Sequence, residues 1–149
     1  MSRRKHPNNA YKQGIFIANN KDKCLNTTCV YRSSYELHLM QMLDQSKNVQ
    51  KWGSEKLIIN YISPFDKSKH RYYPDFVVVL NDNSKYIIEI KPKNQTKPPK
   101  NSRNKKPQTL LYEQTMYYLN VAKWSAAKKY CDRNGYKFLL LDESHLFAF

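Results

Sequence analysis

Residues 71–91 read RYYPDFVVVLNDNSKYIIEIK, and this stretch decides the fold. It contains two apolar runs separated by the turn-forming residues Asn-Asp-Asn-Ser at 81–84. Runs rich in β-branched and aromatic residues on either side of such a turn are typical of a β-hairpin. We therefore expect strands over 71–80 and 85–91, and a similar block at 56–62 extends them to a three-stranded antiparallel meander.

Helical patterns precede and follow these strands. Ser33 and Glu36 form a capping box ahead of apolar residues that recur every three to four positions, which predicts a helix over about 34–46. A second periodic stretch predicts a long helix over about 110–134, and the apolar run 138–141 then predicts a buried strand. The order α-β-β-β-α-β favours one α/β domain, in which a mixed sheet is flanked by helices.

The charge of the chain points to its partner. Its 149 residues include 26 Lys and Arg but only 12 Asp and Glu, so the formal net charge is +14. An excess of this size favours a polyanion, because each cation placed on a phosphate releases counterions. We expect DNA as the partner, bound through its backbone with little sequence specificity, since no sequence-reading module is apparent.

A membrane partner is not expected. No apolar stretch approaches the roughly 20 residues that cross a bilayer, and the N-terminus carries no apolar signal-peptide core. These features predict a soluble, intracellular protein.

Two basic segments stand apart from the periodic blocks. Residues 1–30 predict a basic N-terminal arm ahead of a domain over 31–149, with one short strand near 14–17. Residues 92–108 hold four prolines and no carboxylate that offsets their charge, which predicts an extended loop lying along DNA, with a solvated insertion as the alternative. The cations of this loop are Lys93, Lys97, Lys100, Arg103, Lys105 and Lys106.

Acidic residues are scarce, so their positions are informative. Asp75 opens one expected strand and Glu89 closes the next, so the two carboxylates can face each other across the hairpin. Because side chains alternate along a strand, Lys91 lies on the same face as Glu89. Two such carboxylates suit Mg²⁺ or Mn²⁺, with Lys91 orienting or helping to deprotonate a water. The alternative is a buried strand pair that ends in a surface ion pair.

The motif Pro74-Asp75 followed by Glu89-Ile90-Lys91 resembles the PD-(D/E)XK nuclease superfamily. The resemblance implies a restriction-endonuclease-like core and Mg²⁺-dependent hydrolysis of DNA. It also implies that Glu36 on the first helix joins Asp75 and Glu89 as a metal ligand, and that Lys91 acts on the water. The residues alone also allow Glu36 to serve only the helix cap.

Three further positions are weighed with this motif. Gln114 and Tyr118 resemble a Q-x-x-x-Y element that follows the E-x-K strand in several nuclease families, although an amphipathic helix face accounts for them equally well. Arg32 and Arg71 flank the acidic residues in sequence, and we expect them to contact phosphate. For Arg71, a charge at a strand edge is the alternative.

A closer resemblance covers residues from about 30 to 146. It is carried by Tyr31-Arg32-Ser33 with Glu36, Trp52-Gly53-Ser54-Glu55, Arg71-Tyr72-Tyr73-Pro74-Asp75, Ile88-Glu89-Ile90-Lys91-Pro92-Lys93, Lys123-Trp124-Ser125-Ala126-Ala127 and Gly135-Tyr136-Lys137-Phe138. These segments resemble the head-completion proteins of T-even-like tailed phages. The same core is similar to the endonuclease subunit of heteromeric cut-and-paste transposases.

This second resemblance implies an endonuclease that cuts flaps, branches or ends of packaged phage DNA before the tail attaches. Its place would be the cytoplasm of the infected host cell or the virion, with phage head or neck proteins as partners, and a homodimer is left open. The competing interpretation is a non-catalytic, DNA-binding structural protein of the head–tail junction.

Overall fold

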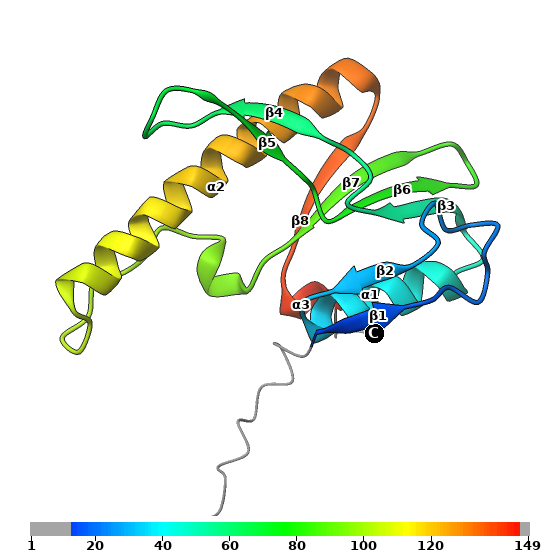
Figure 1. The fold of residues 1–149 in the computed structure, drawn as a ribbon, viewed down its shortest axis with the longest axis horizontal. Helices are drawn as coiled ribbons and strands as arrows, with labels where there is room; N and C mark the ends of the chain where they lie inside the picture. The colour runs from blue at the N-terminus through cyan, green and yellow to red at the C-terminus, as the bar shows by residue number, and fades with distance from the viewer. Residues whose placement is uncertain (1–12, 147–149) are drawn as a thin grey trace, which may run out of the picture.

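The hairpin expected around residues 81–84 forms the centre of a mixed four-stranded sheet in the computed structural model, which describes residues 13–146 (Figure 1). In spatial order, the strands are β3 (Val49–Ser54), β6 (Phe76–Leu80), β7 (Lys85–Ile90) and β8 (Lys137–Leu141). β3, β6 and β7 pair antiparallel. β8 lies parallel to β7, because the chain crosses over through a long helix between them.

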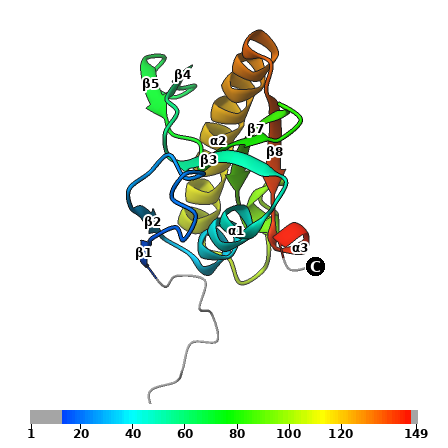
Figure 2. The same cartoon turned by 90° about the vertical axis from the view of Figure 1, so that its right-hand side faces the viewer.

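Helices cover both faces of this sheet (Figure 2). α1 (Ser34–Gln45) and the short α3 (Glu143–Leu146) pack on one face, and α2 (Pro107–Asn134) packs on the other. The two predicted long helices are therefore confirmed, and α2 ends where Gly135 adopts φ 75°. None of the helices between residues 13 and 146 is both long and apolar enough to cross a membrane.

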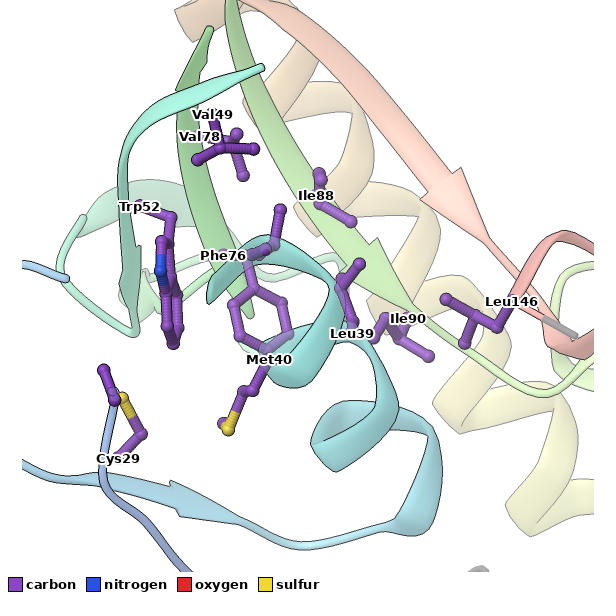
Figure 3. Close-up of a cluster of buried hydrophobic side chains, with 12 residues drawn as sticks. Cys29, Leu39, Met40, Val49, Trp52, Phe76, Val78, Ile88, Ile90 and Leu146 are labelled. Atoms are coloured by element: carbon purple, nitrogen blue, oxygen red, sulfur yellow. The ribbon is translucent and has the colours of Figure 1, made fainter. Parts of the chain in front are cut away.

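The alternation of side chains along β7 divides the core into two clusters. Ile88 and Ile90 belong to the cluster under α1, which also buries Trp52 and Phe76 (Figure 3). Ile87 points to the opposite face, where it packs in a second cluster with residues of α2. Glu89 follows Ile87 by two positions and therefore lies on the α2 side of the sheet.

The N-terminal segment adds to the first cluster. Of the predicted arm, residues 1–12 lie outside the described residues, and β1 (Gly14–Phe16) pairs antiparallel with β2 (Cys29–Tyr31). Ala18 and Cys29 are buried with the side chains of α1. The Asp44 carboxylate of α1, which is 1% exposed, accepts hydrogen bonds from the backbone N–H groups of Asn19 (3.0 Å) and Asn20 (3.2 Å). The described part of the segment thus packs on the sheet and α1, while a boundary at residue 30 stays a prediction.

The predicted meander is wrong in its first strand. β4 (Ile59–Ile62) pairs with β5 (Lys69–Tyr72) in a separate two-stranded sheet that contacts α2. The predicted block 71–80 divides between β5 and β6 around Pro74, because proline has no N–H for a strand ladder. The first strand of the main sheet is instead β3, whose sequence VQKWGS carries little of the apolar alternation that identifies a strand.

Two further expectations change. The loop expected over 92–108 contains a short 3₁₀ turn, η2 (Lys93–Gln95), and gives way to α2 at Pro107. Proline is accepted there because the first N–H groups of a helix have no intrahelical partner. The run 138–141, expected to be buried, lies in the edge strand β8, where Leu139 is 36% exposed.

Replacing Asp44 tests how firmly the segment 13–30 is attached. Asp44→Ala leaves the backbone N–H groups of Asn19 and Asn20 without their acceptor. Because one hydrogen bond contributes about 0.5–1.5 kcal/mol, we expect a loss of about 1–3 kcal/mol in the free energy of unfolding, measured by urea denaturation. Asp22→Ala is the matched control, because it removes the same charge from an exposed position of the same segment. Equal stability of the two variants would show that the Asp44 hydrogen bonds contribute nothing.

Candidate active site

The strands β6 and β7 bring two carboxylates together at the edge of their ladder. Phe76 pairs with Ile88, so Asp75 and Glu89 lie one step beyond this pair. The backbone N–H of Ile90 donates to Oδ2 of Asp75 (2.8 Å), and that of Asp75 donates to Oε2 of Glu89 (3.4 Å). The predicted meeting of the two carboxylates across the hairpin is therefore observed.

Glu89 is buried and Asp75 is half-buried, so the two carboxyl groups have lost much of their contact with water. Glu89 is 5% exposed, and burial raises its pKa, although a hydrogen bond from the hydroxyl of Tyr72 (2.5 Å) and the charge of Lys91 oppose the shift. Burial also raises the pKa of Asp75, and the negative charge of Glu89 raises it further. Folding thus holds two like charges together at the cost of their hydration.

Positive charge faces this pair from two elements. The Nζ of Lys91 lies 3.7 Å from Oε1 of Glu89, on the face that strand alternation predicts. Lys123 comes from α2, with its ammonium 5.8 Å from the centre of the Tyr61 ring and 5.9 Å from that of Tyr72. Burial lowers the pKa of Lys123, and the neighbouring charge of Lys91 lowers it further.

Tyr72 and Lys123 were not singled out as site residues from the sequence. Tyr72 lies three positions before Asp75, and only the break at Pro74 turns its side chain toward Glu89 from a different sheet. Burial raises the pKa of Tyr72, and the charge of Glu89 raises it further, so the phenol remains a hydrogen-bond donor. The sequence did hold a signal for Lys123. This lysine lies on the apolar face of the long helix, and that face packs against the E-x-K strand.

Glu36 lies beside the pair but is otherwise engaged. Its backbone N–H donates to Oγ of Ser33 (3.2 Å), so the predicted helix cap is present, and its carboxylate accepts from the backbone N–H of Arg32 (2.5 Å). Its charge contributes to the raised pKa of Asp75. Between residues 13 and 146, no three carboxylate, imidazole or thiol side chains are gathered closely enough to hold a metal ion.

The acidic pair alone nevertheless fits a hard divalent cation. Mg²⁺ commonly takes one or two protein carboxylates and completes its coordination with water and substrate phosphate. The hydrogen bonds described above use Oδ2 of Asp75 and Oε2 of Glu89. A cation at this position would also relieve the repulsion between the two buried charges.

The other predicted contact residues are dispersed. Arg32 forms an ion pair with Glu55 (2.6 Å), and Arg71 is exposed on β5, opposite Asn60. In α2, Tyr118 is 57% exposed and Gln114 is half-buried, and neither lines the cavity beside Lys91.

The basic loop is only partly arranged as expected. Lys93, Lys97, Lys100 and Lys105 line a cavity of about 740 Å³ that begins at Lys91. Arg103 and Lys106 are exposed and do not line it. The expectation that no carboxylate offsets the loop is wrong for one cation, because Glu113 of α2 forms an ion pair with Lys105 (2.8 Å).

Two comparisons with known proteins place the chain among endonucleases. Residues 46–143 match the family model described as TnsA-like endonuclease N terminal. The chain is 31% identical over 121 residues to the head completion nuclease of Enterobacteria phage T4, a match that covers 79% of this chain and 81% of that protein. The family match includes the whole main sheet, with Asp75, Glu89 and Lys91, whereas Glu36 precedes it.

Neutralising one of the two buried carboxylates should stabilise the fold. Because burial raises the pKa of Glu89, its charged form opposes folding at neutral pH, and Glu89→Gln removes that charge while keeping an oxygen for the Tyr72 hydroxyl. We expect the Tm in EDTA to rise by about 2–4 °C, which corresponds to about 1 kcal/mol in a domain of this size. Asp22→Asn, at an exposed position, is the control and should leave the Tm unchanged; a lower Tm for Glu89→Gln would contradict the repulsion argument.

Proposed function

The chain belongs to the TnsA-like endonuclease family, and on this premise we propose that it is a metal-dependent DNA endonuclease acting in phage head completion. The observation that carries the proposal is the buried pair Asp75 and Glu89, with Lys91 at its side. The name of the phage T4 relative supports the place of the reaction in head completion. We include a PD-(D/E)XK core in the proposal, supported by the chain order α1-β3-β6-β7-α2-β8 around the main sheet.

The proposed cofactor is Mg²⁺ or Mn²⁺, held by Asp75 and Glu89. Glu36 would join them as a third carboxylate only by giving up its hydrogen bond from the backbone N–H of Arg32. When bound, the ion stabilises negative charge on the scissile phosphate and lowers the pKa of its water. Asp75 is held in place by the N–H of Ile90, and Glu89 by the hydroxyl of Tyr72. These hydrogen bonds fix the direction of both carboxylates before substrate arrives.

The lysines complete the proposed site. Lys91 is close enough to Glu89 to orient a water or a phosphate oxygen beside it, and Lys123 adds a second cation on the same side of the sheet. Both favour the approach of a phosphodiester to a centre that is otherwise acidic. The cations of the loop, together with Arg32 and Arg71, are the proposed backbone contacts, which carry little sequence information.

The substrate we propose is DNA with a structural irregularity, such as a flap, a branch or an end. Phage head or neck proteins are the proposed partners, in the cytoplasm of the infected cell or on the virion. The competing function, a structural DNA-binding protein of the head–tail junction, shares the net charge of +14 but has no need for the acidic pair.

Cleavage of labelled linear, forked and flapped DNA tests the function. Wild type should cut with Mg²⁺ and not in EDTA, while Glu89→Gln and Lys91→Ala should lose at least about 100-fold in rate, since each removes a group that acts on the metal or the water. Glu89→Gln keeps every cation of the loop and the cavity, so its affinity for DNA in EDTA is the control. If wild type cuts no substrate while Glu89→Gln binds DNA as wild type does, the structural function is the better account.

Tyr72 provides a finer test of the site. Tyr72→Phe removes only the hydroxyl that holds Glu89, so we expect about a tenfold lower single-turnover rate and a higher requirement for Mg²⁺, with DNA affinity unchanged. Tyr73→Phe removes the same atom from the neighbouring exposed residue and should behave as wild type. Equal rates for the two variants would mean that Tyr72 does not position Glu89 for catalysis.

A further inference from the structure

The cavity beside Lys91 is formed by two segments that are adjacent in the chain. After β7, the chain runs through the basic loop and alongside the first half of α2 (Figure 1), and both segments line the cavity. Its volume is about 740 Å³. The lining comprises Lys91, Lys93, Asn94, Gln95, Lys97, Pro98, Pro99, Lys100, Lys105, Tyr112, Glu113, Met116, Tyr117, Asn120 and Glu143.

The charges around the cavity select an anion. Five lysines line it against two carboxylates. One carboxylate, that of Glu113, is paired with Lys105 (2.8 Å), and the other, that of Glu143, accepts the backbone N–H of Lys93 (2.9 Å). Both carboxylates therefore already have protein partners, and the remaining lysines leave the cavity positive.

The rest of the lining is aromatic and apolar. Tyr112, Met116 and Tyr117 follow one another on the helix face that lines the cavity. Tyr117 is supported by ring contacts with Tyr118 (5.8 Å between centroids) and Trp124 (6.4 Å). Positive grooves that carry exposed aromatic rings are typical of proteins that bind single-stranded nucleic acid, because bases stack on the rings.

The amide of Asn120 adds a polar group to the lining. The residue as a whole is 6% exposed, and its side chain is among those that line the cavity. An amide offers both donors and an acceptor, which is what the edge of a nucleobase requires.

The volume limits what can enter. Cavities of about 300–1,000 Å³ take ligands of drug size, which is about the size of one or two nucleotides. A DNA duplex does not fit, because its major groove alone is about 12 Å wide. The ligand must be small, carry negative charge, and offer flat faces and polar edges. An unpaired stretch of a DNA strand has all of these, in its phosphates and its bases.

We propose that this cavity binds unpaired nucleotides of the DNA substrate, with phosphates on its lysines and a base against Tyr112 and Tyr117. The inference rests on the proposed function, because Lys91 belongs both to the cavity and to the site at which the phosphodiester would be cut. It specifies the substrate class: DNA with a single-stranded segment next to the cleavage point, such as a flap or a fork, in preference to an uninterrupted duplex.

Binding without cleavage tests the proposal. In EDTA, the affinity of the full chain is measured for a short oligo-dT strand and for a blunt duplex, with wild type, Tyr112→Ala and Leu111→Ala. Tyr112 is 65% exposed and lines the cavity, while the adjacent Leu111 is 64% exposed and does not. We expect Tyr112→Ala to weaken binding of the single strand about tenfold and binding of the duplex hardly at all, with Leu111→Ala as wild type.

A second readout reports on stacking itself. A 2-aminopurine placed in the unpaired arm of a forked DNA should lose fluorescence on binding to wild type and recover it with Tyr112→Ala. Equal weakening of single-strand and duplex binding by Tyr112→Ala, or an unchanged fluorescence, would overturn the proposal. The same would follow if a polyglutamate peptide of equal charge bound with the same dependence on Tyr112, because it has no bases to stack.

These measurements separate the two hypotheses. They need no metal and no cleavage, so an inactive wild type would contradict the endonuclease and leave the single-strand comparison readable. Conversely, an active wild type that cuts uninterrupted duplex as fast as forked DNA, with no effect of Tyr112→Ala, would contradict the cavity proposal and the preference for irregular DNA, but not the endonuclease activity.

Discussion

The burial of two carboxylates on neighbouring strands is the constraint around which this structure is arranged. Asp75 and Glu89 repel each other, and burial raises the pKa of both. Such a pair persists only because the surrounding fold offsets the free-energy cost of burying and pairing like charges. Backbone N–H groups of the hairpin and the hydroxyl of Tyr72 offset part of this cost by donating hydrogen bonds to one oxygen of each carboxylate. A site that holds negative charge at a cost to stability is what a cation-dependent reaction requires.

This constraint also explains the accessory elements. The sheet of β4 and β5 interrupts the chain between β3 and β6, and its last residue, Tyr72, donates to Glu89. α2 packs on this small sheet and directs Lys123 over the rings of Tyr61 and Tyr72. The second hydrophobic cluster thus holds an aromatic and a cationic group against the acidic pair. On the α2 side of the sheet, the residues that pack the core therefore also place Tyr72 and Lys123 near the acidic pair.

The sequence predicts those features that depend on residues close together in the chain, and misses those that depend on tertiary contacts. The hairpin, α1 and α2 follow from periodicity and turn residues, and the register that opposes Asp75 to Glu89 follows from the short turn between them. β3 was missed because its environment comes from elsewhere: Trp52 is buried between Phe16 and Phe76, which are distant in sequence. Tyr72 and Lys123 were missed for the same reason, since their partners are set by tertiary packing. Glu113, which pairs with Lys105 across the loop, is a further case.

The position of Lys91 links the two parts of the proposed site. Its side chain reaches Glu89 at the end of β7, and its backbone N–H donates to the carbonyl of Leu141 in β8, so the residue is held at both ends. The basic loop starts at the next residue, and its first lysine, Lys93, lies in the wall of the cavity. A DNA strand bound in the cavity, as proposed, would have its backbone beside Lys91 and therefore close to the acidic pair. The proposed selection of unpaired DNA and the proposed placement of the phosphate would then both depend on the end of β7.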